Sequence, residues 1–338
     1  MRKTLKRAGN ITLISAFTST LIFSMSACGH THEWGAWNRA ETEHWRVCKT
    51  CGKEEHEQHA ADSKCSVCGA HFKALALGYN EGGDGAHSDF AREANEWFSQ
   101  QAEELGFTYD FSTDFGKLND ETLAQYDLVI LLNDKPSDTK QQDAFRRYMD
   151  NGGATMIFHS AAFAMWDNNT PPSEWEDWFH NTLLGSGEYG YGNDPEHPDI
   201  LYWNTWNPTS EPLKVETYDH FATENLVLKN DEFMSSPCEW YAWHNDIMND
   251  PNFTMLVTLN PTPENPAGDD PREGMEFQIW TTGHHPIAWS NNSYKMIYMN
   301  WGHNLQSYNN FEKESKTFSC PEICQFVIDG MYGLVTEE

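Results

Sequence analysis

From residue 73 onward, short apolar runs alternate with segments whose apolar residues recur at helical spacing. The run 127–132 is continuously apolar after its first residue, which is typical of a central parallel strand buried on both faces. Residues 88–105 carry apolar side chains on one helical face and are followed by Gly106, so they predict an amphipathic helix. The same patterns predict further strands at 74–79, 107–111 and 154–158, and another helix at 139–151. Repeated strand–helix–strand units predict an α/β fold with a doubly wound parallel sheet, which binds ligands at the carboxyl ends of its strands.

The first 27 residues have the pattern of a secretory signal peptide. A basic start precedes the mostly apolar run 11–25, which is too short and wrongly flanked for a membrane-spanning helix. The end of this run, Met25-Ser26-Ala27-Cys28-Gly29, resembles a bacterial lipobox. We therefore expect Cys28 to be the lipidated first residue of a protein of the bacterial cell envelope, at the outer membrane, with the lipid as its only membrane contact. Ordinary cleavage nearby is the alternative.

Residues 28–72 form a separate Cys- and His-rich segment that precedes the main domain, 73–338. The stretches Cys48-Lys49-Thr50-Cys51-Gly52 and Cys65-Ser66-Val67-Cys68-Gly69 are two CxxC-Gly knuckles, 13 residues apart. In such a turn both sulfurs can point at one ion. The spacing predicts one tetrahedral Zn²⁺ site with the four thiolates of Cys48, Cys51, Cys65 and Cys68. Because the segment has almost no aliphatic residues, the ion would staple its fold.

Two alternatives to the four-thiolate site stay open. The stretch from His32 to His59 resembles a small Trp- and Cys-rich bacterial surface repeat, in which His32 or His59 completes a site with Cys48 and Cys51. An exported protein can also form a pair of disulfides from these cysteines. In each case we interpret the segment as a structural zinc-ribbon-like module or spacer, because nothing in it suggests a catalytic metal with an open position.

Composition excludes one class of partner. The 338-residue chain has 51 acidic and 22 basic residues, a formal net charge of −29. A nucleic-acid binder needs a basic surface that neutralises phosphates, so we expect no nucleic-acid partner. Aromatic residues make up 14% of the chain, which indicates a folded protein with a full core rather than a disordered one.

Several motifs of the main domain, taken in order, resemble the trehalose-utilisation (ThuA-like) family. They span about residues 74–335 and include Gly85-Ala86-His87-Ser88, Gly152-Gly153-Ala154-Thr155-Met156-Ile157-Phe158-His159-Ser160-Ala161, Asp219-His220-Phe221-Ala222-Thr223, Cys238-Glu239-Trp240-Tyr241, His285-Pro286-Ile287-Ala288-Trp289 and Trp301-Gly302-His303. The resemblance implies a flavodoxin-like sheet similar to that of class I glutamine amidotransferases, and a link to sugar catabolism. One departure is the stretch 184–192, which lacks a His that members often carry there.

Amidotransferase chemistry does not fit the residues. That reaction needs a Cys nucleophile at a strand-to-helix elbow, where this chain has His159 and Ser160. Ser160 lacks the surrounding Gly-x-Ser-x-Gly elbow, and a helix N-cap is the favoured interpretation of it. Cys238 lies in an apolar setting typical of a buried, inert thiol.

Histidines are the remaining candidates for catalytic side chains in the main domain. His87, His159 and His303 each follow a predicted strand, so we expect them to converge above the sheet. With Glu239 they can form an acid–base pair or bind a second metal ion. We assign His159, His303 and Glu239 as candidate catalytic residues. The candidate binding residues are His87, Tyr241, Trp240, His220 and His285. Of these, His220 and His285 are expected in structural positions or at the rim of the pocket. His180, on a Trp-rich helix, is expected to pack in the core.

Tryptophans suggest the ligand class. Sugar sites pair aromatic rings with polar side chains, and Trp166, Trp203, Trp206, Trp240 and Trp243 lie among Asn and Asp residues, although core packing explains most tryptophans. Two hypotheses follow. The chain is a carbohydrate-active hydrolase or isomerase that acts on a disaccharide or keto-sugar, or it is a non-catalytic surface sugar-binding or scaffold lipoprotein. A small carbohydrate is the expected partner in the first case.

Overall fold

The computed structural model describes residues 30–39, 43–59, 64–65, 67–79, 85–163, 172–187, 192–193, 201–202, 205–241, 243, 245–259, 285–304 and 316–336. The expected leader, Cys28, Trp166 and Trp203 lie outside these residues. Among the helices of the described part, none combines the length and apolar character that crossing a bilayer requires.

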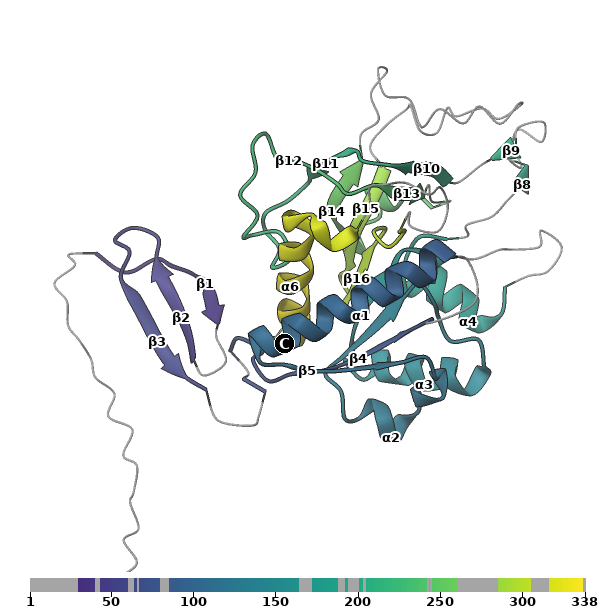
Figure 1. Cartoon of the computed structure of the whole chain (residues 1–338), viewed down its shortest axis with the longest axis horizontal. Helices are drawn as coiled ribbons and strands as arrows, with labels where there is room; N and C mark the ends of the chain where they lie inside the picture. Colours follow the sequence, from purple (N-terminus) through teal and green to yellow (C-terminus); the bar gives the residue numbers. More distant parts are fainter. Residues whose placement is uncertain are drawn as a thin grey trace, which may run out of the picture.

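A nine-stranded mixed sheet forms the centre of the main domain (Figure 1). Its strands, in spatial order, are β12 (Glu232–Met234), β11 (Pro212–Val215), β14 (Phe253–Leu259), β15 (His285–Asn291), β16 (Met296–Met299), β7 (Ala154–Phe158), β6 (Leu128–Leu132), β4 (Lys73–Gly78) and β5 (Thr108–Ser112). The five strands from β16 to β5 are parallel and follow the flavodoxin-like order.

The remaining strands correct the expectation of a wholly parallel sheet. β15 and β16 form an antiparallel hairpin, and β14, β11 and β12 continue the sheet antiparallel beyond it. The physical reason is the turn 292–295, which joins β15 to β16 without the crossover that a parallel pair requires.

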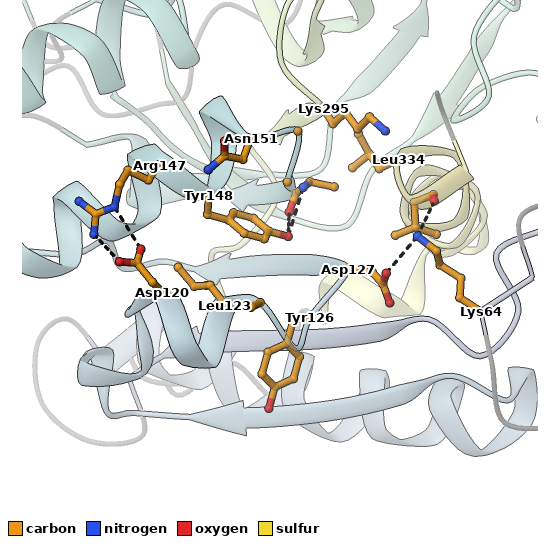
Figure 2. A pocket seen from close by; sticks show the side chains of 15 residues that line it. Lys64, Asp120, Leu123, Tyr126, Asp127, Arg147, Tyr148, Asn151, Lys295 and Leu334 are labelled. Atoms are coloured by element: carbon orange, nitrogen blue, oxygen red, sulfur yellow. Dashed lines mark hydrogen bonds and ion pairs between the residues drawn. The ribbon is translucent and has the colours of Figure 1, made fainter.

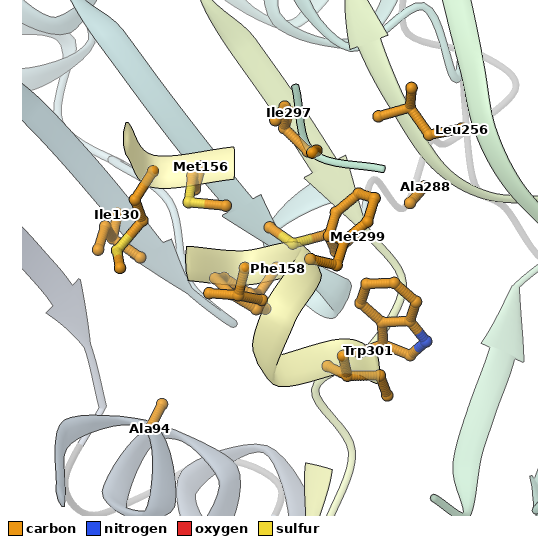
Figure 3. Packing of buried hydrophobic residues seen from close by; sticks show 14 of the residues in the cluster. Ala94, Ile130, Met156, Phe158, Leu256, Ala288, Ile297, Met299 and Trp301 are labelled. Atoms are coloured by element: carbon orange, nitrogen blue, oxygen red, sulfur yellow. The ribbon is translucent and has the colours of Figure 1, made fainter. Parts of the chain in front are cut away.

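Both faces of the parallel half are buried, as the continuous apolar run of β6 predicts. Every residue of this strand is buried, and its side chains alternate between two separate core clusters. Helices α1 (Gly85–Leu105) and α6 (Pro321–Thr336) cover one face. The opposite face is covered by α3 (Thr139–Asp150), the short α4 (Glu174–Asp177) and the π-helical turn η3 (Trp178–Leu183). Figure 3 shows Met156 and Phe158 of β7 beside Ile297 and Met299 of β16 in the first cluster.

Smaller elements complete the domain. A short helix α2 (Asp120–Leu123) precedes β6, and β13 (Cys238–Tyr241) pairs with β10 (Thr205–Thr209) outside the main sheet. Short two-residue strands, β8 (Gly192–Asn193) and β9 (Leu201–Tyr202), pair with each other. The single turns are η1 (Phe115–Lys117), η2 (His159–Ala162), η4 (Ile247–Asn249) and η5 (Thr317–Ser319).

The N-terminal segment forms its own three-stranded antiparallel sheet, drawn apart from the main sheet in Figure 1. Its strands are β1 (Trp34–Arg39), β2 (Glu43–Cys48) and β3 (Glu54–Gln58). Among the residues of these strands whose burial is described, only His44 and Cys48 are buried, so this part of the small sheet shows no apolar core of its own.

Candidate functional site

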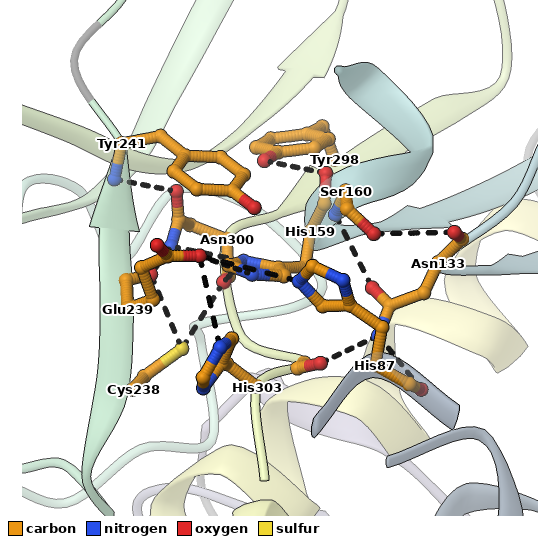
Figure 4. A network of polar contacts seen from close by, with 11 residues as sticks. His87, Asn133, His159, Ser160, Cys238, Glu239, Tyr241, Tyr298, Asn300 and His303 are labelled. Carbon is orange, nitrogen blue, oxygen red and sulfur yellow. Dashed lines mark hydrogen bonds and ion pairs between the residues drawn. The ribbon is translucent and has the colours of Figure 1, made fainter. Parts of the chain in front are cut away.

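Four of the residues singled out in the sequence meet at the carboxyl edge of the parallel strands. His87 lies in the first turn of α1, after β4, and His159 directly follows β7. His303 lies in the loop after β16, and Glu239 projects from β13. Since β4, β7 and β16 run in one direction, their following residues share one edge of the sheet. Figure 4 shows the three imidazoles and the carboxylate turned toward one another.

The distances show that the three histidines surround a single carboxylate oxygen. Glu239 Oε2 lies 3.5 Å from Nε2 of His159, 3.8 Å from Nε2 of His303 and 4.0 Å from Nε2 of His87. The side chain of His159 is fully buried, whereas that of Glu239 is 22% exposed. The carboxylate of Glu239 and the imidazole of His87, which is 16% exposed, are therefore the parts of the cluster that a ligand can approach from solvent.

The orientation of His159 follows from the contacts of its other ring nitrogen. Nδ1 lies 2.7 Å from the carbonyl oxygen of Asn300, which can only accept, so we assign the proton to Nδ1. In the neutral ring this leaves the lone pair on Nε2, facing Glu239. The backbone of His159 has φ 44°, an unusual conformation for a residue other than glycine. Strained residues of this kind cluster at functional sites.

Asn300 connects the strand that carries Glu239 to the parallel sheet. Its side-chain amide donates to the carbonyl oxygen of Glu239 at 2.7 Å, and its Oδ1 accepts from the backbone N–H of Tyr241 at 3.1 Å. Since its own carbonyl holds His159, a single residue positions both members of the His159–Glu239 pair.

Asn133, which follows β6, performs a similar task on the other side. Its amide donates to the carbonyl oxygens of Gly302 (2.6 Å) and His87 (3.2 Å), and its Oδ1 accepts from the N–H of Ser160 (3.2 Å). Neither Asn133 nor Asn300 was among the site residues predicted from the sequence. One signal was available, because each is a polar residue immediately after a buried apolar strand.

Glycine is required at position 302 because the loop after β16 passes very close to His159 and Asn133. A Cβ built there would lie 2.7 Å from Cβ of His159 and 3.1 Å from Oδ1 of Asn133, and the φ of Gly302 is +146°. The loop that delivers His303 can therefore pass His159 only without a side chain at this position.

The two alternative nucleophiles are held in inert environments. Ser160 donates its hydroxyl to the carbonyl oxygen of Asn133 at 3.1 Å, and the N-cap of the turn is Phe158, so the expected N-cap role of Ser160 is wrong. Burial raises the pKa of Cys238 to about 12, which leaves it a neutral thiol near neutral pH.

The remaining candidate binding residues occupy different positions. Tyr241 stacks on His159, with ring centroids 4.2 Å apart. Trp243 contacts the edge of Tyr241 at 5.8 Å. His285 begins β15, at the same edge of the sheet, and is half-buried. Trp240 is fully buried in the core cluster under α6, so its role is packing rather than contact with a ligand.

His220 lies away from this cluster, which corrects its assignment as a binding residue of the same site. It lines a cavity of about 400 Å³ beside Lys295 and Met296, where β16 begins. That is the amino-terminal edge of the parallel strands. Its Nδ1 accepts from the N–H of Ala222, and burial lowers the pKa of His220 to about 4.

A larger cavity, of about 520 Å³, also opens at the amino-terminal edge (Figure 2). Four of its five charged side chains form two ion pairs, Arg147 with Asp120 at 3.0 Å and Lys64 with Asp127 at 3.0 Å, and the fifth is Lys295. Volume alone would favour this cavity, but the convergent histidines and carboxylate lie at the opposite edge. We therefore place the candidate site at the His87–His159–His303–Glu239 cluster.

The four N-terminal cysteines do not converge on one point, which corrects the predicted four-thiolate site. Cys48 and Cys51 group with His30 and His32, and Cys65 and Cys68 group with His44 and His59. His32 thus accompanies Cys48 and Cys51, as in the surface repeat that this segment resembles, whereas His59 belongs to the other group. None of these four cysteines is disulfide-bonded, so the disulfide alternative is not realised in this structure.

Two kinds of chemistry fit the central cluster. The ligand atoms of His87, His303 and Glu239 all lie within 4.8 Å of one another, a grouping able to hold a divalent cation while leaving positions open. His159 lies outside that set of three and faces the same carboxylate. An imidazole in this position is a side chain able to accept and return a proton.

Comparisons with known proteins agree with this architecture. A family model described as ThuA, trehalose utilisation, matches residues 76–316. The chain is similar to the crystal structure of a ThuA-like protein from Bacteroides uniformis, with 29% identity, a TM-score of 0.62, and coverage of 80% of this chain and 94% of that chain. It is also similar to a ThuA-like protein from Parabacteroides merdae, with 15% identity, a TM-score of 0.49, and coverage of 78% and 90%, respectively. No curated protein matches it.

Proposed function

The chain belongs to the ThuA family of trehalose utilisation, and from this membership we propose that it is an enzyme acting on a disaccharide or keto-sugar. The observation that carries the proposal is the convergence of three imidazole Nε2 atoms on Glu239 Oε2, at 3.5–4.0 Å. A binding surface for sugar hydroxyls needs no such concentration of groups that exchange protons near neutral pH.

In this proposal the residues divide into two roles. His87, His303 and Glu239 hold a divalent cation, which supplies a Lewis acid for a sugar carbonyl or hydroxyl. Nε2 of His159 accepts a proton from the substrate or from an attacking water and later returns it. Proton return to a neighbouring carbon gives isomerisation, and water attack gives hydrolysis.

The half-buried Trp243 supports a carbohydrate as substrate. Tyr241 is itself buried against His159, and Trp243, which contacts Tyr241, offers the aromatic surface on which an apolar sugar face can pack. The second candidate function is a sugar-binding or scaffold protein without turnover, and these same aromatic rings favour it equally.

The test is a product screen with the full chain. Trehalose, other disaccharides and their keto derivatives are incubated with the protein with and without Zn²⁺ or Mn²⁺, and products are separated by chromatography. We expect turnover that falls at least 100-fold in Glu239→Gln and His303→Ala. The matched control is His56→Ala, which removes an exposed histidine of β3 outside the three clusters.

The outcomes separate the two functions. Ligand-induced thermal stabilisation without any product would favour the sugar-binding protein. Turnover that survives in both Glu239→Gln and His303→Ala would contradict the proposed site.

We further propose that Cys28 carries a lipid and that the segment 28–72 spaces the enzyme from the envelope. The lipobox-like stretch at residues 25–29 supports this proposal. Cys28→Ser should yield an unacylated protein in the soluble fraction. An acylated, membrane-bound Cys28→Ser protein would contradict it.

A further inference from the structure

Two Cys–His groups in the N-terminal segment have the dimensions of separate metal sites. In the first group, Cys48 Sγ lies 3.6 Å from His30 Nε2 and Cys51 Sγ lies 3.5 Å from His32 Nδ1. A tetrahedral zinc ion about 2.3 Å from sulfur and about 2.0–2.1 Å from nitrogen would separate two such ligands by about 3.6 Å. The observed distances therefore match two edges of one coordination tetrahedron.

The second group also brings two cysteines and two histidines together, with one distance equal to the tetrahedral edge and one shorter. Cys65 Sγ lies 3.6 Å from His44 Nδ1, and Cys68 Sγ lies 3.1 Å from His59 Nε2. The other nitrogen of His44 lies 3.3 Å from a carboxylate oxygen of Glu57. A carboxylate behind a histidine ligand fixes its tautomer and orients the ring, which is the usual arrangement around protein-bound zinc.

Both CxxC turns are built in the same way. The N–H of Gly52 donates to the carbonyl oxygen of Cys48 at 2.9 Å, and that of Gly69 donates to the carbonyl oxygen of Cys65 at 2.8 Å. Each glycine has a positive φ, 69° and 74° respectively. The matching turns aim two sulfurs at one point in each group, so each knuckle serves a different ion.

We propose that residues 30–68 bind two structural zinc ions, one at His30, His32, Cys48 and Cys51, and the other at His44, His59, Cys65 and Cys68. Two thiolates balance the charge of each ion, and four protein ligands close its coordination shell. Neither ion has a position for a substrate. The ions replace the apolar core that the small sheet lacks.

The two ions have different structural tasks. The first lies within the small sheet, between the residues preceding β1 and the turn that follows β2. The second ion joins that sheet to the main domain, because the Cys65–Cys68 turn that binds it packs against α6. A Cβ at Gly69 would lie 2.9 Å from Val335 and 3.1 Å from Tyr332, and Nζ of Lys64 donates to the carbonyl oxygen of Val335.

The test is metal stoichiometry of the full chain, measured by atomic emission after purification without chelators. We expect each of Cys51→Ser and Cys68→Ser to lose one zinc equivalent, and the double variant to lose two. Cys324→Ser is the matched control, since Cys324 is a free cysteine outside both groups and should lose none. A single four-thiolate site would lose the same one equivalent in all three variants. That result, or disulfides among the four cysteines, would overturn the proposal.

Hydrogen exchange separates the two tasks and does not depend on catalysis. Cys68→Ser should increase exchange in residues 67–72 and at the end of α6, whereas Cys51→Ser should leave α6 protected. Equal loss of protection at α6 in both variants would contradict the joining role of the second ion. Any zinc bound at the His87–His303–Glu239 cluster would add the same amount to the wild type and to every variant. The differences in zinc content between these proteins therefore do not depend on whether the proposed function is correct.

Discussion

The imidazole of His159 lies nearly parallel to the phenol ring of Tyr241, with centroids 4.2 Å apart and planes 18° apart. The hydrogen bond from Nδ1 to Asn300 fixes the rotation of the same ring about its χ angles. Reorienting the imidazole would break both contacts, so Nε2 stays directed at Glu239. Catalytic groups are effective when their own rotamers are locked by packing and hydrogen bonds in this way.

Replacement of His159 should therefore affect both stability and activity. His159→Ala leaves a cavity and removes one of the two donors to the buried carbonyl oxygen of Asn300, which keeps the thiol of Cys238, and should lower the free energy of unfolding by about 3 kcal/mol. His159→Asn tolerates the positive φ and can still donate to Asn300, so it should cost about 1 kcal/mol. Both variants lose Nε2 and should lose turnover. Urea unfolding together with the product screen tests this, and an active His159→Asn protein would refute the proton-transfer role.

The parallel half of the fold and the meeting of the three histidines were predictable for a topological reason. His87, His159 and His303 each come shortly after an apolar run, and parallel strands place such positions at one edge. The same argument fails for Glu239, because β13 lies outside the main sheet and its approach depends on the side chain of Asn300. His220 also follows no strand of the parallel set, and it lies at the opposite edge.

The Cys–His groups of the N-terminal segment show a second limit of prediction from the sequence. CxxC spacing identifies cysteines that share an ion, but strand pairing decides which histidines join them. β2 pairs with both β1 and β3, which brings His44 near His59 and separates the two CxxC turns. Periodicity cannot supply that information, because it depends on contacts across strands.

Gly302→Ala tests the close approach of the loops around His159. The added Cβ would lie 2.7 Å from Cβ of His159, and an alanine at this position would have to adopt an unfavourable φ of +146°. We expect a loss of about 3 kcal/mol in unfolding free energy and a loss of turnover as His159 and His303 shift. Gly152→Ala is the control, because Gly152 also has a positive φ (+85°) but no atom within 4 Å of the added Cβ. It should cost about 1 kcal/mol, and equal losses in the two variants would show that backbone strain alone is responsible.

His180 tests the expectation of core packing. It is buried in η3 with its ring against Phe179 at 5.1 Å, and neither ring nitrogen has a hydrogen-bond partner among the described residues. Burial lowers the pKa of His180 well below its usual value, so the ring is neutral. His180→Ala should lose about 2 kcal/mol through its cavity, whereas His180→Leu should be neutral or slightly stabilising in urea unfolding. A His180→Leu protein as unstable as His180→Ala would show that the ring makes a polar contact.

Glu93 gives the fold a pH dependence near neutrality. This residue of α1 accepts from the backbone N–H groups of Thr317 and Phe318 and lies 3.4 Å from the side-chain amide of Asn304, next to His303. Burial raises the pKa of the Glu93 carboxyl to about 7. The folded protein therefore binds more protons at this group than the unfolded chain between about pH 4.5 and 7. Stability is lost as the pH rises through that window, because the buried group must ionise.

Glu93→Gln removes this ionisation and should change stability in a pH-dependent way. Relative to wild type, the variant should gain on the order of 2–3 kcal/mol in unfolding free energy between pH 4.5 and pH 8. Urea unfolding at both values measures the difference. Glu96→Gln, an exposed position of the same helix, is the control and should show no such change. A Glu93→Gln difference that is the same at pH 4.5 and pH 8 would mean that Glu93 is already ionised at the lower pH, held by the two backbone N–H groups.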